Sequence, residues 1–162
     1  MKRVWAPWRM EYIADSKAKG CIFCIPPESG NDREKLIFFR SRFSFVMLNR
    51  YPYTNGHLMI APFRHTADLN DLADDEMLDL FSVLRICRNA LQETAGPQGF
   101  NIGINLGKAA GAGVDEHMHI HIVPRWNGDT NFMTVIGDIR VMPENLMRTY
   151  DALLPSLQAA KR

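Results

Sequence analysis

Short apolar runs occupy the first half of the chain, and turn-forming residues separate them. Runs of β-prone residues lie at 36–39 and 43–48, turn residues fill 50–56, and strand character returns at 57–61 before Pro62. Strands that follow one another so closely in sequence pair most simply as antiparallel neighbours. The pattern therefore predicts three sequential strands that form a meander.

The hydrophobic pattern changes to a helical period between about residues 70 and 93. Apolar side chains recur at intervals of three and four residues, at Leu72, Ala73, Met77, Leu80, Phe81, Leu84, Cys87 and Leu91. Acidic residues gather near the start of this segment, and Arg85 and Arg88 lie toward its end, as the helix dipole favours. Gly96 and Pro97 then close it, so a long amphipathic helix is predicted.

The second half of the chain adds two strands and a second helix. Residues 100–106 predict a strand, a glycine-rich connection follows at 107–113, and residues 117–124 alternate between histidine and apolar side chains. The periodic segment near 143–157 predicts a terminal helix, with a proline allowed in its first turn. Five strands in largely sequential order with two helices indicate the α+β class rather than an alternating parallel fold.

The segment at 117–124 holds three of the five histidines in the chain, at alternate positions. In a strand, His117, His119 and His121 would line one face at steps of roughly 6.6 Å, while the apolar residues between them enter the core. In a helix of about 100° per residue, the middle imidazole would point away from the other two. Only the strand brings the three side chains together, which favours a reactive face.

Two other interpretations of these histidines stay open. A His-x-His pair on a strand can present two ring nitrogens to one metal ion, so the histidine strand could itself be a metal site. The three side chains could also be solvated or satisfied residues on an amphipathic strand. Because imidazole titrates near pH 6.5 and serves as nucleophile, proton carrier or ligand, we expect chemistry at this position.

Bulk properties narrow the class of protein. A length of 162 residues predicts a single domain over 1–162, with an N-terminal segment 1–35 and a C-terminal extension at about 127–162. A net charge of +1 gives no basic field for a nucleic acid, and no apolar run approaches the length of a membrane span. The start of the chain lacks an apolar signal segment and there are three cysteines, so we expect a soluble protein of the reducing cytoplasm.

The glycine-rich connection before the histidines favours phosphate binding. Gly107, Gly111 and Gly113 allow backbone N–H groups to approach an anion closely and to form a concave nest. Asn105 could add a side-chain donor at the start of the same loop. A flexible connection between two strands is the alternative, and the adjacent histidines favour the phosphate interpretation.

The run HMHIHIV at residues 117–123 matches the pattern His-φ-His-φ-His-φ-φ, where φ is apolar. The chain thereby resembles the histidine triad (HIT) superfamily. The likeness continues through Asn49, the Gly56-His57 turn, the long helix and Pro124-Arg125-Trp126. It implies a five-stranded antiparallel sheet with one long helix and a C-terminal helix.

Residues 5–9, the Cys-x-x-Cys at 21–24 and the tail at 126–133 resemble a bacterial HIT group related to Fhit and to diadenosine tetraphosphate phosphorylases. The resemblance implies an enzyme that acts on dinucleoside polyphosphates, of the Ap3A or Ap4A kind, or on related AMP derivatives. A covalent nucleotidyl-histidine would form and then be released to an acceptor. A nucleotide-binding signalling or scaffold protein with little turnover is the alternative.

The resemblance also assigns roles to single residues. His119 becomes the nucleophile and His121 the residue that contacts phosphate oxygens or helps the leaving group. His57 is expected near the triad, and Asn49 corresponds to a ribose-binding asparagine. The glutamine that Fhit places near the phosphates has no counterpart between Asn105 and Gly113. Histidine at the third position of the triad favours hydrolysis or phosphorolysis over sugar-nucleotide exchange, and both of these remain open.

A structural zinc site is the second expectation from the resemblance. Cys21 and Cys24 alone are too few, because a structural zinc ion takes four protein ligands. In zinc-bearing HIT relatives, the positions of His65 and His117 supply the third and fourth. His117 would then act by orienting the neighbouring His119, and it would not contact phosphate. Reduced thiols with a solvated His65 are the alternative.

HIT proteins of this group are expected to be homodimers with small-molecule nucleotide substrates. Four aromatic side chains in or near the predicted loops are consistent with burial against a partner, although packing within one chain explains them equally well. They are Trp5, Trp8, Trp126 and Phe132.

Overall fold

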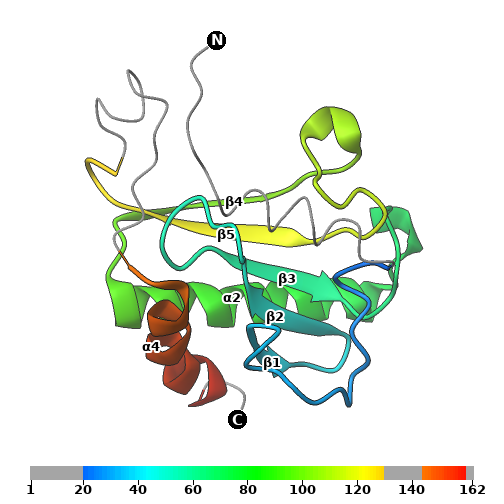
Figure 1. Ribbon diagram of the computed structural model, residues 1–162. Coiled ribbons are helices and arrows are strands. Elements are labelled where there is room, and N and C mark those ends of the chain that lie inside the picture. The colour runs from blue at the N-terminus through cyan, green and yellow to red at the C-terminus, as the bar shows by residue number, and fades with distance from the viewer. Residues whose placement is uncertain (1–19, 130–143, 160–162) are drawn as a thin grey trace.

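A computed structural model describes residues 20–129 and 144–159 of the chain, and Figure 1 shows its arrangement. Five antiparallel strands form one sheet in the order β1-β2-β3-β5-β4. The strands are β1 (Ile37–Arg40), β2 (Ser44–Leu48), β3 (Leu58–Pro62), β4 (Gly99–Ile104) and β5 (Ile120–Arg125). The first three form the predicted meander, and β5 lies between β3 and β4 in the sheet.

Both faces of the central strands are buried, which explains why β2 and β3 are apolar at almost every position. Alternate side chains of a strand point to opposite faces of the sheet. Val46 and Ile60 accordingly join the main core beneath the helices, whereas Phe45 and Met59 join a second, smaller core on the other face. The second core also contains Phe23, from the segment that precedes the sheet.

Helix α2 (Asp74–Ala95) covers one face of the sheet and ends at Gly96, which has a left-handed φ of +56°. The helix begins four residues later than predicted, because Leu69–Asp71 forms a short 3-10 turn instead. The Asp68 side chain accepts a hydrogen bond from the N–H of Asn70, and such local bonds compete with helix formation. At the true start, the Glu76 carboxylate accepts the N–H of Ala73 at 2.9 Å.

Helix α4 (Leu146–Ala159) packs against α2 and β1. Its Tyr150 hydroxyl donates to the carbonyl oxygen of Ile37 at 2.7 Å, and its ring stacks on Phe38. Pro143, which was expected in the first turn, lies outside the described residues, as do Trp5, Trp8 and Phe132. Trp126 is partly buried. Neither helix described here has the length and apolarity needed to cross a membrane.

The histidine segment is less regular than the predicted strand. Strand β5 begins at Ile120, so only His121 of the three histidines lies within it. The N–H of Met118 donates to the carbonyl of Thr66 at 2.7 Å, outside the sheet, which keeps the preceding residues out of the strand. The apolar half of the predicted alternation is confirmed, because Met118, Ile120 and Ile122 are all buried in the main core. His117 and His119 are buried as well, and His117 joins a cluster with Cys21, Cys24 and His65.

The turn before β3 is tightly packed around Gly56, which a substitution can test. Its φ is +76°, and a Cβ there would lie 3.0 Å from Leu91 Cδ2 and 3.4 Å from Pro124 Cγ. We expect Gly56→Ala to lower the free energy of unfolding by about 2–3 kcal/mol, through left-handed strain and overpacking. Gly30→Ala, which meets no atom within 4 Å and needs no positive φ, should change it by less than about 1 kcal/mol in the same urea titration. Equal effects would show that Gly56 has no special role.

Candidate active site

Three imidazole rings meet at the junction of β3 and β5. The His119 and His121 rings lie edge to face, with centroids 4.6 Å apart, and the His57 ring lies 5.1 Å from that of His121. His57 immediately precedes β3, and His121 pairs with Met59 of β3 in the sheet register. The structure therefore brings His57 to the triad, as the resemblance predicts.

The proton of neutral His119 is placed by the backbone. Its Nδ1 lies 2.9 Å from the carbonyl oxygen of His117, and because a carbonyl can only accept, Nδ1 must carry the hydrogen. The other ring nitrogen, Nε2, then has a free lone pair. Burial lowers the pKa of His119, whose side chain is 5 % exposed, and so favours the neutral ring. A neutral imidazole with an unprotonated Nε2 is suited to nucleophilic attack.

The proton of neutral His121 is placed by a chain of hydrogen bonds through His57. The backbone N–H of Tyr53 donates to His57 Nδ1 at 3.1 Å, so the hydrogen of neutral His57 is on Nε2. That Nε2–H donates to His121 Nδ1 at 2.9 Å. The hydrogen of neutral His121 is therefore on its own Nε2, where it can be donated to a ligand.

Burial also controls the charge of His121. It lowers the pKa of His121 to about 4, and repulsion from a charged His119 acts in the same direction. Near neutral pH, His121 is therefore a neutral hydrogen-bond donor rather than an imidazolium. His121 can therefore bind phosphate through a neutral N–H group but not through a positive charge.

Asn49 lies next to His57 but also shapes the turn before it. Its Nδ2 lies 3.3 Å from His57 Nδ1, which acts as acceptor, and its Oδ1 accepts the N–H of Tyr51 at 2.9 Å. The backbone N–H of Asn49 donates to the carbonyl of His57, closing the turn. A ribose-binding role for Asn49 stays a prediction.

The glycine-rich loop lies between β4 and β5. Gly107 and Gly111 have φ values of +80° and +86°, a conformation that disfavours other residues, and Lys108–Ala110 forms a short 3-10 turn between them. Asn105 Nδ2 donates to the carbonyl of Gly111 at 3.5 Å and so closes the loop on itself. Gly113 is exposed. Phosphate binding by these residues stays a prediction, since their described hydrogen bonds are internal to the loop.

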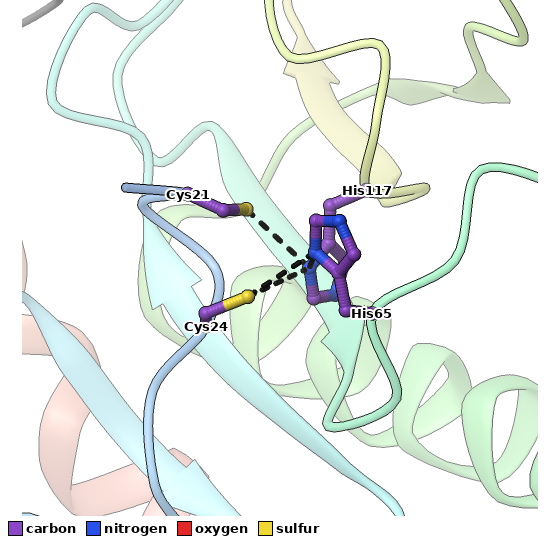
Figure 2. Close-up of side chains that lie close together, drawn as sticks. All are labelled: Cys21, Cys24, His65 and His117. Carbon is purple, nitrogen blue, oxygen red and sulfur yellow. Dashed lines mark hydrogen bonds between the residues drawn. The ribbon is translucent and has the colours of Figure 1, made fainter. Parts of the chain in front are cut away.

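A second cluster joins Cys21, Cys24, His65 and His117, which lie in three separate segments of the chain (Figure 2). The cysteines precede β1, His65 follows β3, and His117 precedes β5. One ligand atom from each side chain lies within 4.8 Å of all the others. His65 Nδ1 lies 3.2 Å from the Cys24 sulfur and 3.3 Å from His117 Nδ1.

These spacings fit the edges of a tetrahedron around zinc, which are about 3.3–3.8 Å for zinc–nitrogen and zinc–sulfur bonds of ordinary length. His117 Nδ1 lies 3.5 Å and 3.9 Å from the two sulfur atoms. The Nε2–H of His117 donates to the carbonyl of Pro62 at 2.9 Å, which leaves Nδ1 unprotonated and directed at the cluster. The donor set and its tautomer therefore suit a tetrahedral metal ion.

Two aromatic residues that the sequence did not single out lie against the histidines. The Phe23 ring lies 4.5 Å from that of His119, and the Tyr53 ring lies 4.7 Å from that of His57. Neither position follows from hydrophobic periodicity, because both are in irregular segments. The only signal in the sequence for Phe23 is its place between the two cysteines.

An antiparallel sheet packed against a long helix, with alternating histidines that lead into β5, defines the histidine triad class of proteins. The chain belongs to the HIT family, since the model described as "HIT domain" matches residues 31–128. The predicted family and the α+β fold are confirmed.

Two of the similar proteins carry the names of enzymes that act on dinucleoside polyphosphates. The chain is 38% identical over 158 residues to an AP-4-A phosphorylase of Mycobacterium tuberculosis, covering 92% of this chain and 80% of the relative. It is 36% identical over 93 residues to a bis(5'-adenosyl)-triphosphatase of Dictyostelium discoideum, covering 57% of this chain and 62% of the relative. These names agree with the predicted class of hydrolase or phosphorylase.

Among solved structures, a zinc-bound histidine triad family protein from Mycobacterium smegmatis superposes with a TM-score of 0.66 at 28% sequence identity. The match covers 86% of this chain and 94% of that protein. This relative and the cluster of Figure 2 are both compatible with a zinc site.

We expect His121 to remain largely neutral at about pH 5, where an ordinary histidine is mostly protonated. The unfolded chain takes up this proton first, so the free energy of unfolding should fall as the pH drops from about 6.5 to about 4. Nitrogen-detected histidine NMR measures the titration directly. The same chain in concentrated urea, where histidines titrate near 6.5, is the control. A midpoint near 6.5 in the folded protein would contradict the burial argument.

Proposed function

We propose that this protein cleaves dinucleoside polyphosphates through a covalent nucleotidyl intermediate on His119, as a hydrolase or a phosphorylase. The observation that carries the proposal is the hydrogen bond from His119 Nδ1–H to the carbonyl of His117. It leaves the lone pair of Nε2 available on a ring that lies beside His121, which in turn contacts His57. The names of the similar phosphorylase and triphosphatase support the choice of substrate class.

In the first step, His119 Nε2 attacks the α-phosphorus, and the bond from that phosphorus to the bridging oxygen breaks. The leaving oxygen keeps the electron pair and departs as part of a nucleotide polyphosphate anion. The Nε2–H of His121 stabilises the developing charge by a hydrogen bond. His121 need not give up its proton, because a polyphosphate is a good leaving group near neutral pH.

In the second step, an acceptor attacks the phosphorus of the nucleotidyl-histidine and releases His119. Water yields a nucleoside monophosphate, whereas inorganic phosphate yields a nucleoside diphosphate. Both acceptors are consistent with the names of the relatives, one a phosphorylase and one a triphosphatase. The products therefore distinguish the two reactions.

The substrate-binding residues complete this proposal. Asn49 is assigned to the ribose, since its side chain lies beside His57 in the turn that leads into the site. Gly107, Gly111 and Gly113, with Asn105 at the start of their loop, are assigned to the phosphates through backbone N–H groups. Their position between β4 and the histidine segment supports this assignment.

Cys21, Cys24, His65 and His117 are proposed to hold one structural zinc ion. The closeness of their four ligand atoms, which all lie within 4.8 Å of one another, and the zinc-bound relative support it. A zinc ion held in this way would cross-link three segments of the chain. It would not take part in the reaction, because protein ligands would occupy all four of its coordination positions. His117 then acts by holding His119 in place.

We also propose that a cytoplasmic, single-domain homodimer is the working form. Among the strands in the described ranges 20–129 and 144–159, β4 lies at an edge of the sheet and carries exposed Ile102, and helix α2 exposes Leu78 and Phe81. An edge strand and exposed apolar side chains both favour association with a second copy.

Replacement of the nucleophile tests the covalent step. His119→Ala should lower kcat at least about 10³-fold and abolish labelling of the protein by radioactive diadenosine tetraphosphate. His121→Ala is the contrasting variant: it should lower the rate about 10²-fold but still form the labelled adduct. Rapid quench in alkali, followed by gel analysis, measures the adduct. Undiminished turnover in His119→Ala would exclude the mechanism, and binding without turnover by the native protein would favour the signalling alternative.

Metal analysis after dialysis tests the zinc site. The native protein and His119→Ala should each retain one equivalent of zinc, whereas Cys24→Ser should lose most of it, because a ligand is missing. Cys87→Ala is the matched control, since this buried cysteine lies in the main core and should leave the stoichiometry unchanged. Two equivalents, or loss of metal on His119→Ala, would instead place the ion on the histidine strand.

A further inference from the structure

Phe23 lies between Cys21 and Cys24 in sequence and against the proposed nucleophile in space. Its side chain is 1 % exposed, and its ring centroid is 4.5 Å from that of His119, with an interplanar angle of 31°. It also lies 5.5 Å from the His117 ring. The same short segment therefore supplies two proposed metal ligands and an aromatic contact to the reactive side chain.

The His119 ring is held on three sides. Nδ1–H is bonded to the carbonyl of His117, the His121 ring lies against it edge to face, and Phe23 covers one face. A flip of the imidazole about its Cβ–Cγ bond would exchange the positions of nitrogen and carbon atoms and break the carbonyl bond. Because interiors are closely packed, the Phe23 ring restricts the space for such a motion.

Phe23 is itself held by the turn that carries the two thiols. The N–H of Cys24 donates to the carbonyl of Cys21 at 3.1 Å, and the N–H of Ile25 donates to the carbonyl of Phe23 at 2.8 Å. This turn precedes β1, so it has no strand partner of its own among the described residues. Its sulfur atoms face His65 and His117, as Figure 2 shows.

The Cys/His cluster thus reaches His119 by two routes. One runs through His117, whose backbone carbonyl accepts the Nδ1–H of His119. The other runs through the cysteine turn, whose Phe23 covers the His119 ring. Separation of the turn from His65 and His117 would loosen both supports together.

We infer that Phe23 is a positioning residue for His119, and that metal binding by the Cys/His cluster holds Phe23 in place and thereby keeps His119 in its reactive tautomer. The inference rests on the proposed function for its kinetic consequence. Its structural content concerns the free protein and needs no nucleotide. A nucleophile that shifts by about 1 Å, or that populates the wrong tautomer, loses roughly tenfold to a hundredfold in rate.

Ile22 provides a matched control within the same turn. It is the other residue between the two cysteines, yet it is 55 % exposed and lies outside both buried cores. Phe23→Leu removes the aromatic contact and keeps an apolar side chain, whereas Ile22→Ala alters the turn without changing what faces His119. Circular dichroism serves to check that each variant is folded, and zinc analysis serves to check that each variant holds zinc.

Long-range proton–nitrogen NMR of the histidine side chains is the readout, because it reports which ring nitrogen carries the hydrogen. We expect one His119 tautomer, protonated on Nδ1, in the zinc-loaded native protein and in Ile22→Ala. Zinc-loaded Phe23→Leu should show a mixture of tautomers, and so should the native protein after removal of zinc with a chelator. The experiment with the chelator uses the native protein, so it still tests the inference if Phe23→Leu folds poorly.

The kinetic arm is the single-turnover rate of adduct formation, which should fall roughly tenfold or more in Phe23→Leu at saturating substrate and less than twofold in Ile22→Ala. A single His119 tautomer that survives either Phe23→Leu or zinc removal overturns the inference. Failure of the covalent mechanism is distinguishable, because it appears as turnover by His119→Ala and leaves the tautomer measurement intact.

Discussion

The hydrogen bond from the His119 ring to the carbonyl of His117 links the chemistry of the site to the fold. It joins residues only two apart, in the stretch of backbone just before β5 begins. That backbone is held by the N–H of Met118, which bonds to Thr66 in the loop after β3. The side chain of His117 is directed away from the site and toward the cysteines. One residue thus divides its functions: its carbonyl serves the nucleophile and its ring serves the Cys/His cluster.

The two-sided burial of the sheet makes this division possible. Helices α2 and α4 pack on one face and, together with the strands beneath them, form the larger of the two cores. The smaller core on the other face is closed by the segment around Phe23, which has little secondary structure to support it. A metal ion that joins this segment to the loops after β3 and before β5 would stabilise the weaker side. Stability and positioning of the site are then provided by the same cross-link.

Patterns within short stretches of sequence predicted the strands, the long helix and the alternating histidines, because each depends on local periodicity. The partners of the cysteines came from family resemblance, since no spacing rule connects Cys21 to His117. Two features could not be predicted. The tautomer of His121 depends on the backbone N–H of Tyr53 acting through His57, and the start of β5 depends on Thr66. Both depend on contacts between residues that are distant in sequence, His57 with His121 and Thr66 with Met118, and no local pattern marks such pairs.

The neutral charge of the site explains how three adjacent histidines can perform different tasks. Three imidazolium ions at these spacings would repel one another strongly in a buried environment, and burial lowers the pKa of all three triad residues. Neutral rings differ only in which nitrogen holds the hydrogen. Backbone carbonyls decide this for His117 and His119, and the side chain of His57 decides it for His121. His119 therefore offers a lone pair where His121 offers a hydrogen, although the two side chains are chemically identical. The role of each histidine therefore depends on the hydrogen-bond partner of its ring more than on its order in the sequence.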